Sequence, residues 1–366
     1  MERRLLIVSA SMGAGHDTVA GELARRLRSR GHRVARCDVL ELLPRGAGPA
    51  LRESYRLTVR HFPWLYGAVY AAFFRDGPVR PGTAPLAVTA ERRLLDTVAE
   101  CRADAVVATF HLAAQVTGRL RASGTLTVPS AVFVTDFAAH RQWVHPGNDL
   151  HLCVTGTAAA RVREHGGRSA FATGPVVPSE FRLRGREPVH WPRVLDSYAP
   201  GRTPVLVSTG AWGVASDLAA TARLIADTGC LPVILCGRDD RLRLRMSKTP
   251  DVLALSWVTD LADLMGAAGA LVDNAAGQTA VQALAAGLPV VGYRPIPGHG
   301  AEGVRAMAAA GVSAYAPDAG ALRDRLTALV HPGPARERQI TAGAAVFTSD
   351  IAQILLDSTG GQRAHP

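Results

Sequence analysis

The chain carries an apolar run, Leu5-Leu6-Ile7-Val8, that leads directly into Ser9-Ala10-Ser11-Met12-Gly13-Ala14-Gly15-His16. Four consecutive apolar residues before a glycine turn are typical of a buried parallel strand. The apolar residues Val19, Leu23 and Leu27 then recur at helical spacing. A strand, a glycine loop and a helix in this order predict the start of an α/β fold, whose loop directs free backbone N–H groups at the oxygen atoms of a ligand.

The glycine loop lacks the two common nucleotide signatures. It has no Gly-Lys-Ser/Thr ending, and Asp17 and Thr18 stand where a dinucleotide fold continues its G-x-G-x-x-G pattern. The residues leave two interpretations open. Either the loop is a tight turn in which His16 caps the helix, or His16 takes part in chemistry.

Apolar runs alternate with helical patterns along the whole chain, which predicts doubly wound parallel sheets. The expected strands are residues 5–10, 34–39, 105–110, 131–135, 150–154, 169–173, 205–209, 232–236, 252–256, 270–272, 290–293 and 312–315. We therefore expect an α/β protein with two Rossmann-like domains facing each other across a cleft. Ligands of such sheets bind outside the carboxyl ends of the strands.

Length and composition set the domain organisation. A chain of 366 residues exceeds the usual size of a single core. The prolines between residues 175 and 200 indicate a linker. We expect an N-terminal domain at 1–175, a linker at 176–200, a C-terminal domain at 201–335, and a final helix and tail at 336–366 that packs back on the N-terminal domain. No stretch is long and apolar enough for a membrane span or a secretory signal, so we expect a cytoplasmic protein.

The five cysteines (Cys37, Cys101, Cys153, Cys230 and Cys236) have no metal-ligand spacing and are expected to be reduced. No zinc site is predicted. The formal net charge of +10 lies entirely in the first 200 residues, which hold 27 arginines against 17 acidic residues. Such asymmetry favours an anionic partner, either a nucleic acid or a membrane surface.

The segment 51–74 breaks the alternating pattern. It holds seven of the chain's 20 aromatic residues together with Arg52, Arg56, Arg60 and His61. Two interpretations are open: a helical hairpin packed on the core, or an interfacial element that is apolar on one side and cationic on the other. We favour contact with an anionic membrane surface. No nucleic-acid partner is expected, because no known reader motif is present.

Two loops of the first half place polar groups after predicted strands. Asp136, His140 and Trp143 follow the strand at 131–135, and His111 follows the strand at 105–110. An aspartate and histidines at these positions can act as acid and base partners, but Asp136 can equally cap a helix.

Three loops of the second half favour an anion. Ser208-Thr209-Gly210-Ala211-Trp212-Gly213 allows close approach to backbone N–H groups, and Arg238 after the next strand supplies a fixed cation. Asp273-Asn274-Ala275-Ala276-Gly277-Gln278-Thr279 then leads into a helix. Together they predict a sugar nucleotide or a similar diphosphate ligand.

These residues as a set resemble the GT-B glycosyltransferases (glycosyltransferase family 28-like) that include the monogalactosyldiacylglycerol synthases and the lipid II N-acetylglucosaminyltransferase. The chain is similar to a divergent, actinobacterial-type member. The likeness covers nearly the whole chain. It rests on residues 9–16, 134–146 and 173–181 in the first half, and on residues 236–242, 256–265 and 276–298 in the second.

The resemblance implies inverting transfer of a hexose from a UDP-sugar to a lipid hydroxyl, such as that of diacylglycerol, by an enzyme peripherally attached to the inner face of the cell membrane. The N-terminal domain would bind the acceptor, the C-terminal domain the nucleotide-sugar, and neither metal nor cofactor is needed. His16 would be the general base, with Asp136 as its catalytic partner. The implied acceptor-binding residues are Gly13, Gly15, His111, His140 and Trp143. The implied donor-binding residues are Gly210, Trp212, Gly213, Arg238, Trp257, Asn274, Ala276, Gly277, Gln278, Thr279, Gln282 and His299.

The chain departs from the family pattern at two places. Gln282 replaces the glutamate that binds the ribose, and a neutral amide accepts more weakly than a carboxylate. Pro297-Gly298-His299-Gly300-Ala301-Glu302-Gly303 replaces Pro-Gly-Gln-Glu-x-x-Asn, so the groups that read the sugar hydroxyls differ. The identity of the hexose is therefore left open. Two alternatives also remain: a transferase acting on a small secondary metabolite, and a sugar-nucleotide binder without activity.

Overall fold

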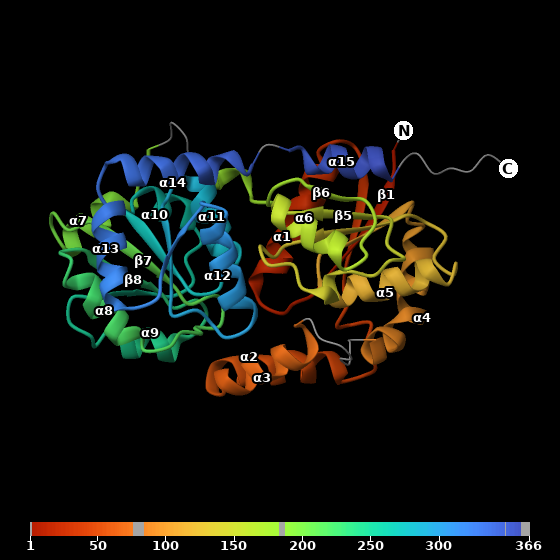
Figure 1. The fold of residues 1–366 in the computed structure, drawn as a ribbon, viewed down its shortest axis with the longest axis horizontal. Helices are drawn as coiled ribbons and strands as arrows, with labels where there is room; N and C mark the ends of the chain where they lie inside the picture. Colours follow the sequence, from red (N-terminus) through yellow and green to blue (C-terminus); the bar gives the residue numbers. More distant parts are fainter. Residues whose placement is uncertain (1, 76–83, 183–186, 348, 360–366) are drawn as a thin grey trace. The chain divides into compact units, whose positions relative to one another are not determined.

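The computed structural model describes residues 2–75, 84–182, 187–347 and 349–359. The chain divides into two compact units (Figure 1). The first unit comprises Met1–Thr58, Trp64–Val176 and Thr348–Pro366, and the second comprises Val59–Pro63 and Val177–Phe347. Each unit is an α/β structure of its own.

The first unit is built on a parallel six-stranded sheet in the order β2-β1-β3-β4-β5-β6. Residues 5–8 of β1 are almost fully buried, as expected for a strand covered by helices on both faces. The strands are β1 (Arg4–Ser9), β2 (Arg33–Asp38), β3 (Ala105–Ala108), β4 (Ser130–Val134), β5 (Leu150–Cys153) and β6 (Ala170–Ala172).

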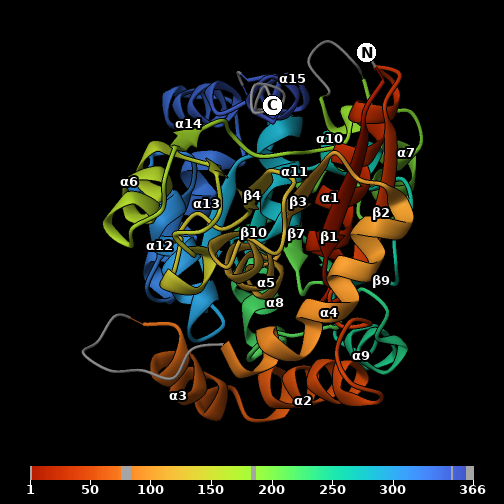
Figure 2. The ribbon, with the colours of Figure 1, turned by 90° about the vertical axis from the view of Figure 1, so that its right-hand side faces the viewer.

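The helices of the first unit connect these strands and return the chain to the same edge of the sheet. They are α1 (Ala14–Arg28), α2 (Ala47–His61), α3 (Pro63–Phe73), α4 (Ala84–Cys101), α5 (His111–Ala122), α6 (Gly156–Glu164) and α15 (Ile351–Ser358), with a 3₁₀ turn, η1, at Arg141–Trp143. The end of α2 and the first residue of α3 are grouped with the second unit. Figure 2 shows α2 and α3 beyond the ends of the strands of the first sheet, with α4 running back towards β2.

The second unit repeats this architecture with a parallel sheet in the order β12-β11-β10-β7-β8-β9. Its core is formed by side chains such as Val205, Ile234 and Val291, which are fully buried. The strands are β7 (Pro204–Ser208), β8 (Leu231–Leu235), β9 (Leu253–Leu255), β10 (Ala270–Asp273), β11 (Val290–Tyr293) and β12 (Ala314–Ala316).

The helices of the second unit follow the same strand–helix alternation. They are α7 (Trp191–Tyr198), α8 (Leu218–Ala226), α9 (Asp240–Met246), α10 (Leu261–Gly266), α11 (Gln278–Ala286), α12 (His299–Ala309), α13 (Ala319–Leu329) and α14 (Pro334–Ala345), with a 3₁₀ turn, η2, at Ser179–Phe181. The predicted fold class and all twelve predicted strands are confirmed.

The segment expected to be a linker, residues 176–200, contains a helix of its own. Asp263 of α10 accepts hydrogen bonds from the backbone N–H groups of Val189, His190 and Trp191, at 2.7, 3.0 and 3.2 Å. These bonds hold the start of α7, so the described part of this segment after residue 186 is fixed to the second unit. Burial raises the pKa of Asp263, but the three backbone bonds outweigh it and the pKa is lowered.

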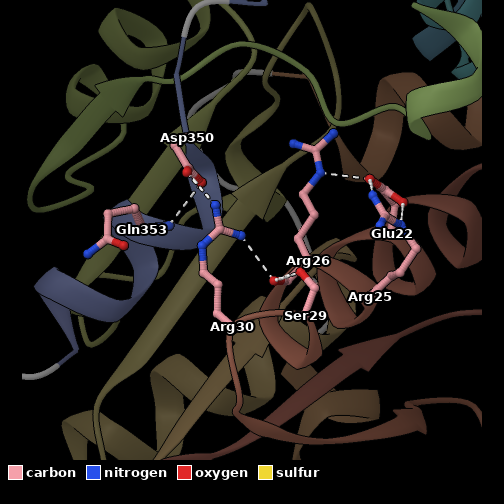
Figure 3. A network of polar contacts seen from close by, with 7 residues as sticks. All are labelled: Glu22, Arg25, Arg26, Ser29, Arg30, Asp350 and Gln353. Carbon is pink, nitrogen blue, oxygen red and sulfur yellow. Dashed lines mark hydrogen bonds and ion pairs between the residues drawn. The ribbon is translucent and has the colours of Figure 1, made fainter. Parts of the chain in front are cut away.

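The last described helix, α15, packs on α1 of the first unit (Figure 3). Arg30 at the end of α1 pairs with Asp350, which also accepts the backbone N–H of Gln353 and so caps α15. Two further bonds run from the guanidinium of Arg3 to the carbonyl oxygen of Leu356 and to Thr359. The apolar side of α15 is buried, with Leu355 at 0% exposure. None of the described helices is long and apolar enough to cross a membrane.

The aromatic and basic segment 51–74 forms α2 and α3. It resolves into two surfaces, because Tyr66 and Tyr70 are buried in the first unit while several large apolar side chains face outwards. Trp64 is the most exposed of them, at 70%. The buried side agrees with a hairpin packed on the core, and the interfacial role of the exposed side stays a prediction.

Candidate functional site

His16 lies in the first turn of α1, after Gly13, whose φ of 105° only glycine adopts readily. Its Nδ1 lies 3.0 Å from the carbonyl oxygen of Thr109, at the end of β3. Because a carbonyl oxygen can only accept, Nδ1 carries the proton and Nε2 keeps its lone pair. The interpretation of His16 as a helix cap is wrong, since α1 has already begun at Ala14 and has no side-chain cap.

Aromatic rings surround the imidazole of His16. Phe110 lies edge-on at 4.9 Å between ring centroids, and Trp143 lies at 6.2 Å. Burial lowers the pKa of His16, and this effect exceeds the opposing influences of the Asp136 charge, the Thr109 carbonyl and Asp17. A lowered pKa keeps the imidazole neutral near pH 7, which is the form that accepts a proton.

Asp136 follows β4 and is held by its neighbours. Its Oδ2 accepts from the indole Nε1–H of Trp143 at 2.8 Å, and its Oδ1 accepts from the hydroxyl of Thr135 at 3.3 Å. His140 Nε2 lies 3.7 Å from Oδ2. Asp136 does not cap a helix, because the next helical turn, η1, is preceded by His140. Its role as a partner in acid–base chemistry stays a prediction.

The two histidines expected around the acceptor, His111 and His140, form an aromatic cluster with this group. His111, the first residue of α5, lies 5.3 Å from His140, and Phe74 lies 5.2 and 4.9 Å from these two rings. Trp143 requires a correction. Its side chain is 0% exposed, so it is covered by protein instead of lining an acceptor site.

Two tyrosines of the same region were missed in the sequence. Tyr66 of α3 donates a hydrogen bond to Tyr55 of α2, and their rings meet edge-on at 5.4 Å. Burial raises the pKa of Tyr55 to about 12, and the charge of Asp136 adds to the effect. The abundance of aromatics in this segment was visible in the sequence, but nothing in their spacing pointed to Asp136.

In the second unit, glycines bring the first two predicted anion loops into contact. A Cβ at Gly237 would lie 2.4 Å from the carbonyl oxygen of Gly210, and a Cβ at Gly213 would lie 2.9 Å from Asp239. The backbone N–H of Arg238 donates to Ala211 O at 3.0 Å across the same contact. Close approach of the two loops therefore depends on glycine at these positions.

The third loop, after β10, is joined to the first. The side-chain amide of Asn274 donates to Val214 O at 2.9 Å. Asp273 is buried and its Oδ2 accepts the N–H groups of Ala275 and Ala276, at 2.9 and 2.6 Å. Burial raises the pKa of Asp273 despite these bonds. The three loops thus meet as predicted. The N–H of Ala276 and the side-chain amide of Asn274, however, donate their hydrogen bonds to other groups of the protein.

Arg238 and Trp257 form an exposed stacked pair. The guanidinium carbon of Arg238 lies 4.5 Å from the ring centroid of Trp257, within cation–π distance. Trp257 is 44% exposed, which is high for an aromatic ring of this size. A cation and a flat apolar surface thus stand together at the carboxyl ends of β8 and β9, beside the loop of Gly237.

Two helix N-termini complete this group. Gly277 precedes α11, whose first turn carries Gln278 and Thr279 and whose fifth residue is Gln282. Gly298 precedes α12, which begins at His299. A Cβ at Gly300 would lie 3.0 Å from Asn274 O, and one at Gly303 would lie 3.1 Å from the Cβ of Ala276. The first turn of α12 therefore packs closely on the loop after β10.

The described part of the chain contains no group of three His, Cys, Asp or Glu side chains placed to hold a metal ion. Among the groups described above, Arg238 and the two helix N-termini contribute positive potential at this end of the second sheet.

The chain is similar to several known glycosyltransferases. The sequence profile of monogalactosyldiacylglycerol (MGDG) synthase matches residues 16–177. A processive diacylglycerol β-glucosyltransferase of Bacillus pumilus is 24% identical over 309 residues, covering 81% of this chain and 79% of that protein. Acinetobacter baumannii MurG has a TM-score of 0.57 at 14% identity, covering 98% and 99% of the two chains. Medicago truncatula UGT71G1, solved with UDP-glucose, has a TM-score of 0.62 at 10% identity, covering 98% and 99%.

Proposed function

We propose that this chain, which belongs to the GT-B hexosyltransferases related to the MGDG synthases, transfers a hexose from a UDP-sugar to a lipid hydroxyl. The acceptor is a diacylglycerol-like lipid, and the transfer inverts the anomeric carbon. The observation that carries the proposal is the environment of His16. A neutral imidazole with a fixed tautomer ends the first glycine loop, and a carboxylate stands close enough for its charge to act on it.

His16 acts as the general base in the first unit. Its Nε2 removes the proton of the acceptor hydroxyl while the oxygen attacks the anomeric carbon, and the bond from that carbon to the diphosphate breaks. The imidazolium that forms is stabilised by the negative charge of Asp136 and by the Thr109 carbonyl. Attack from the side opposite the leaving group gives inversion.

The second unit binds the donor. The loops of Gly210, Gly237 and Gly277 and the first turns of α11 and α12 present N–H dipoles, and Arg238 adds a full charge. These groups stabilise the negative charge that develops on the departing UDP. Trp257 offers a flat face for the base, and Gln282 and His299 bind the sugars. We propose that this arrangement needs no metal ion.

The outward side of α2 and α3 contacts an anionic membrane surface. Its exposed apolar residues are Leu57, Phe62, Trp64, Leu65 and Val69. Arg52 and Arg56 belong to the same segment, where Arg52 donates to the hydroxyl of Ser11 and Arg56 pairs with Glu53, and the first 200 residues hold the whole net positive charge. An exposed tryptophan with neighbouring arginines is suited to the lipid headgroup region. Contact of this kind would bring the first unit to a lipid acceptor.

The test is transfer by the purified chain. We expect UDP-glucose and dioleoylglycerol in vesicles with about one third phosphatidylglycerol to yield a β-linked glycolipid, measured by mass spectrometry and by the proton coupling of the new anomeric centre. Transfer should persist in excess EDTA and fall in vesicles of phosphatidylcholine alone.

Two outcomes would contradict the proposal. Absence of glycolipid from UDP-glucose, UDP-galactose and UDP-N-acetylglucosamine alike would exclude lipid transfer. Equal activity on a water-soluble alcohol without vesicles would favour a small-molecule acceptor instead.

A further inference from the structure

Trp143 differs from the other tryptophans of the chain in being completely buried. Its exposure is 0%, whereas Trp64 and Trp257 are 70% and 44% exposed. It lies in η1, after β4, with its ring centroid 6.2 Å from that of His16 and 6.1 Å from that of His140. A residue this large and this close to the reacting groups, with no surface for substrate, acts through its neighbours.

The indole N–H of Trp143 is committed to one acceptor, Oδ2 of Asp136, at 2.8 Å. A buried indole N–H needs a partner, and an ionised carboxylate is the strongest that a side chain offers. The ring cannot turn, because packing on all sides blocks its two side-chain torsions. The bond therefore fixes the place of one carboxylate oxygen on a loop that has no regular structure between β4 and η1.

We propose that Trp143 is a positioning residue for the transfer reaction: its indole N–H holds the Asp136 carboxylate where its charge stabilises the imidazolium form of His16. This inference rests on the proposed role of His16 as base. It adds that the geometry of Asp136, and not only its charge, is needed for the rate.

Other groups around this pair fix the expected direction of the pH effect. The negative charges that face His16 are Asp136 and, from α1, Asp17. His140 Nε2 also lies beside Asp136, and Tyr55 and Tyr66 from α2 and α3 lie within its field. When the Asp136 carboxylate loses its anchor and moves away, His16 loses part of the attraction that raises its pKa. The acidic limb of the rate profile then moves to lower pH.

The test is Trp143→Phe, which keeps an aromatic ring but removes the N–H. In the vesicle assay we expect kcat to fall about tenfold, the KM for the UDP-sugar to stay unchanged, and the acidic limb of kcat to move down by about half a pH unit. On an Asp136→Asn background the same substitution should cause little further loss, because the charge that it positions is already absent.

The chain provides a matched control in the second unit. Trp191, 9% exposed, donates its indole N–H to Asp260 Oδ2 at 2.9 Å, which is the same indole–carboxylate pairing away from His16, although Asp260 itself is exposed. Trp191→Phe should lower the melting temperature about as much as Trp143→Phe does. It should leave kcat and the pH profile unchanged.

A wild-type kcat and pH profile in Trp143→Phe would overturn the proposal, as would a full additional loss on the Asp136→Asn background. If Trp143→Phe does not fold, Asp136→Glu tests the same point with the ring intact, because it keeps the charge but moves it. It should show the same loss of kcat, and wild-type kinetics would overturn the proposal. Failure of the wild-type chain to make glycolipid would instead contradict the proposed function.

Discussion

The glycine loop after β1 and the glycine loops after β7, β8 and β10 have the same place in two similar sheets, yet they are built for different tasks. The first carries a histidine whose tautomer is set by Thr109 and whose surroundings are aromatic. The others carry glycines that let backbone segments touch, and a buried Asp273 that shapes the loop from within. We therefore propose proton chemistry for the first unit and anion binding for the second.

Removing the base is expected to have the largest effect. His16→Ala should lower kcat by about 10²–10⁴, the range for loss of a general base, because it removes the imidazole that accepts the proton. The KM for the UDP-sugar should change little. His331→Ala, an exposed histidine of the second unit, is the control.

Disrupting the glycine contact of the second unit should give the opposite pattern. Gly237→Ala places a Cβ 2.4 Å from Gly210 O at a φ of +62°, so the two loops must separate. We expect affinity for UDP to fall by about 2 kcal/mol, or roughly thirtyfold, as measured by calorimetry. Gly201→Ala has a similar φ of +69° but open space at its Cβ. It should lose stability and keep its UDP affinity, and equal losses of affinity in both variants would contradict the account.

Lowering the pH should reduce the stability of the first unit, because it favours protonation of buried histidines. Burial lowers the pKa of His151 of β5 below its ordinary value of 6.5 in the folded chain. The unfolded chain therefore binds the proton more readily. The stability linked to neutral His151 is complete above pH 6.5 and is lost as the pH falls below it.

The free energy of unfolding in urea should accordingly fall between pH 7 and pH 5.5 on account of this group. His151→Asn should show a smaller fall, whereas His331→Asn should behave like the wild type. An identical pH dependence in His151→Asn and the wild type would refute this assignment.

The smallest effect is expected at Ala276, which has a left-handed φ of +52° in the loop after β10. Ala276→Gly relieves this strain and should raise the free energy of unfolding by about 0.5–1 kcal/mol. Arg102 directly follows α4 in the first unit and has a φ of +47°, so Arg102→Gly is the matched relief of strain away from the loops. A loss of stability in Ala276→Gly would show that the methyl group contributes more by packing than the strain costs.

The sequence was sufficient for the sheets because buried parallel strands appear as continuous apolar runs, as Leu5 to Val8 do. The loops could be placed together because the carboxyl ends of such strands share one edge of the sheet. The partners of individual polar groups could not be predicted. Asp273 accepts hydrogen bonds from backbone N–H groups that we expected to bind a ligand. Asp263 accepts hydrogen bonds from the proline-rich segment that we expected to be a linker.

Trp143 shows the same limit in the first unit. Its position beside Asp136 and His140 in the sequence indicated a polar loop, and the family resemblance implied an acceptor-binding role. Whether a side chain faces a substrate or the core depends on how the loop after β4 folds over α5, which is a tertiary property. The structure buries the ring completely and gives its N–H to Asp136.

The division of tasks between the units is tested most directly by measuring UDP affinity and the single-turnover rate of hexose transfer on the same two variants, His16→Ala and Gly237→Ala. The account predicts wild-type UDP affinity with transfer lowered by at least a hundredfold in His16→Ala. In Gly237→Ala it predicts weakened UDP affinity, with transfer largely recovered at saturating donor. Loss of UDP affinity in His16→Ala, or retention of its transfer rate, would contradict it.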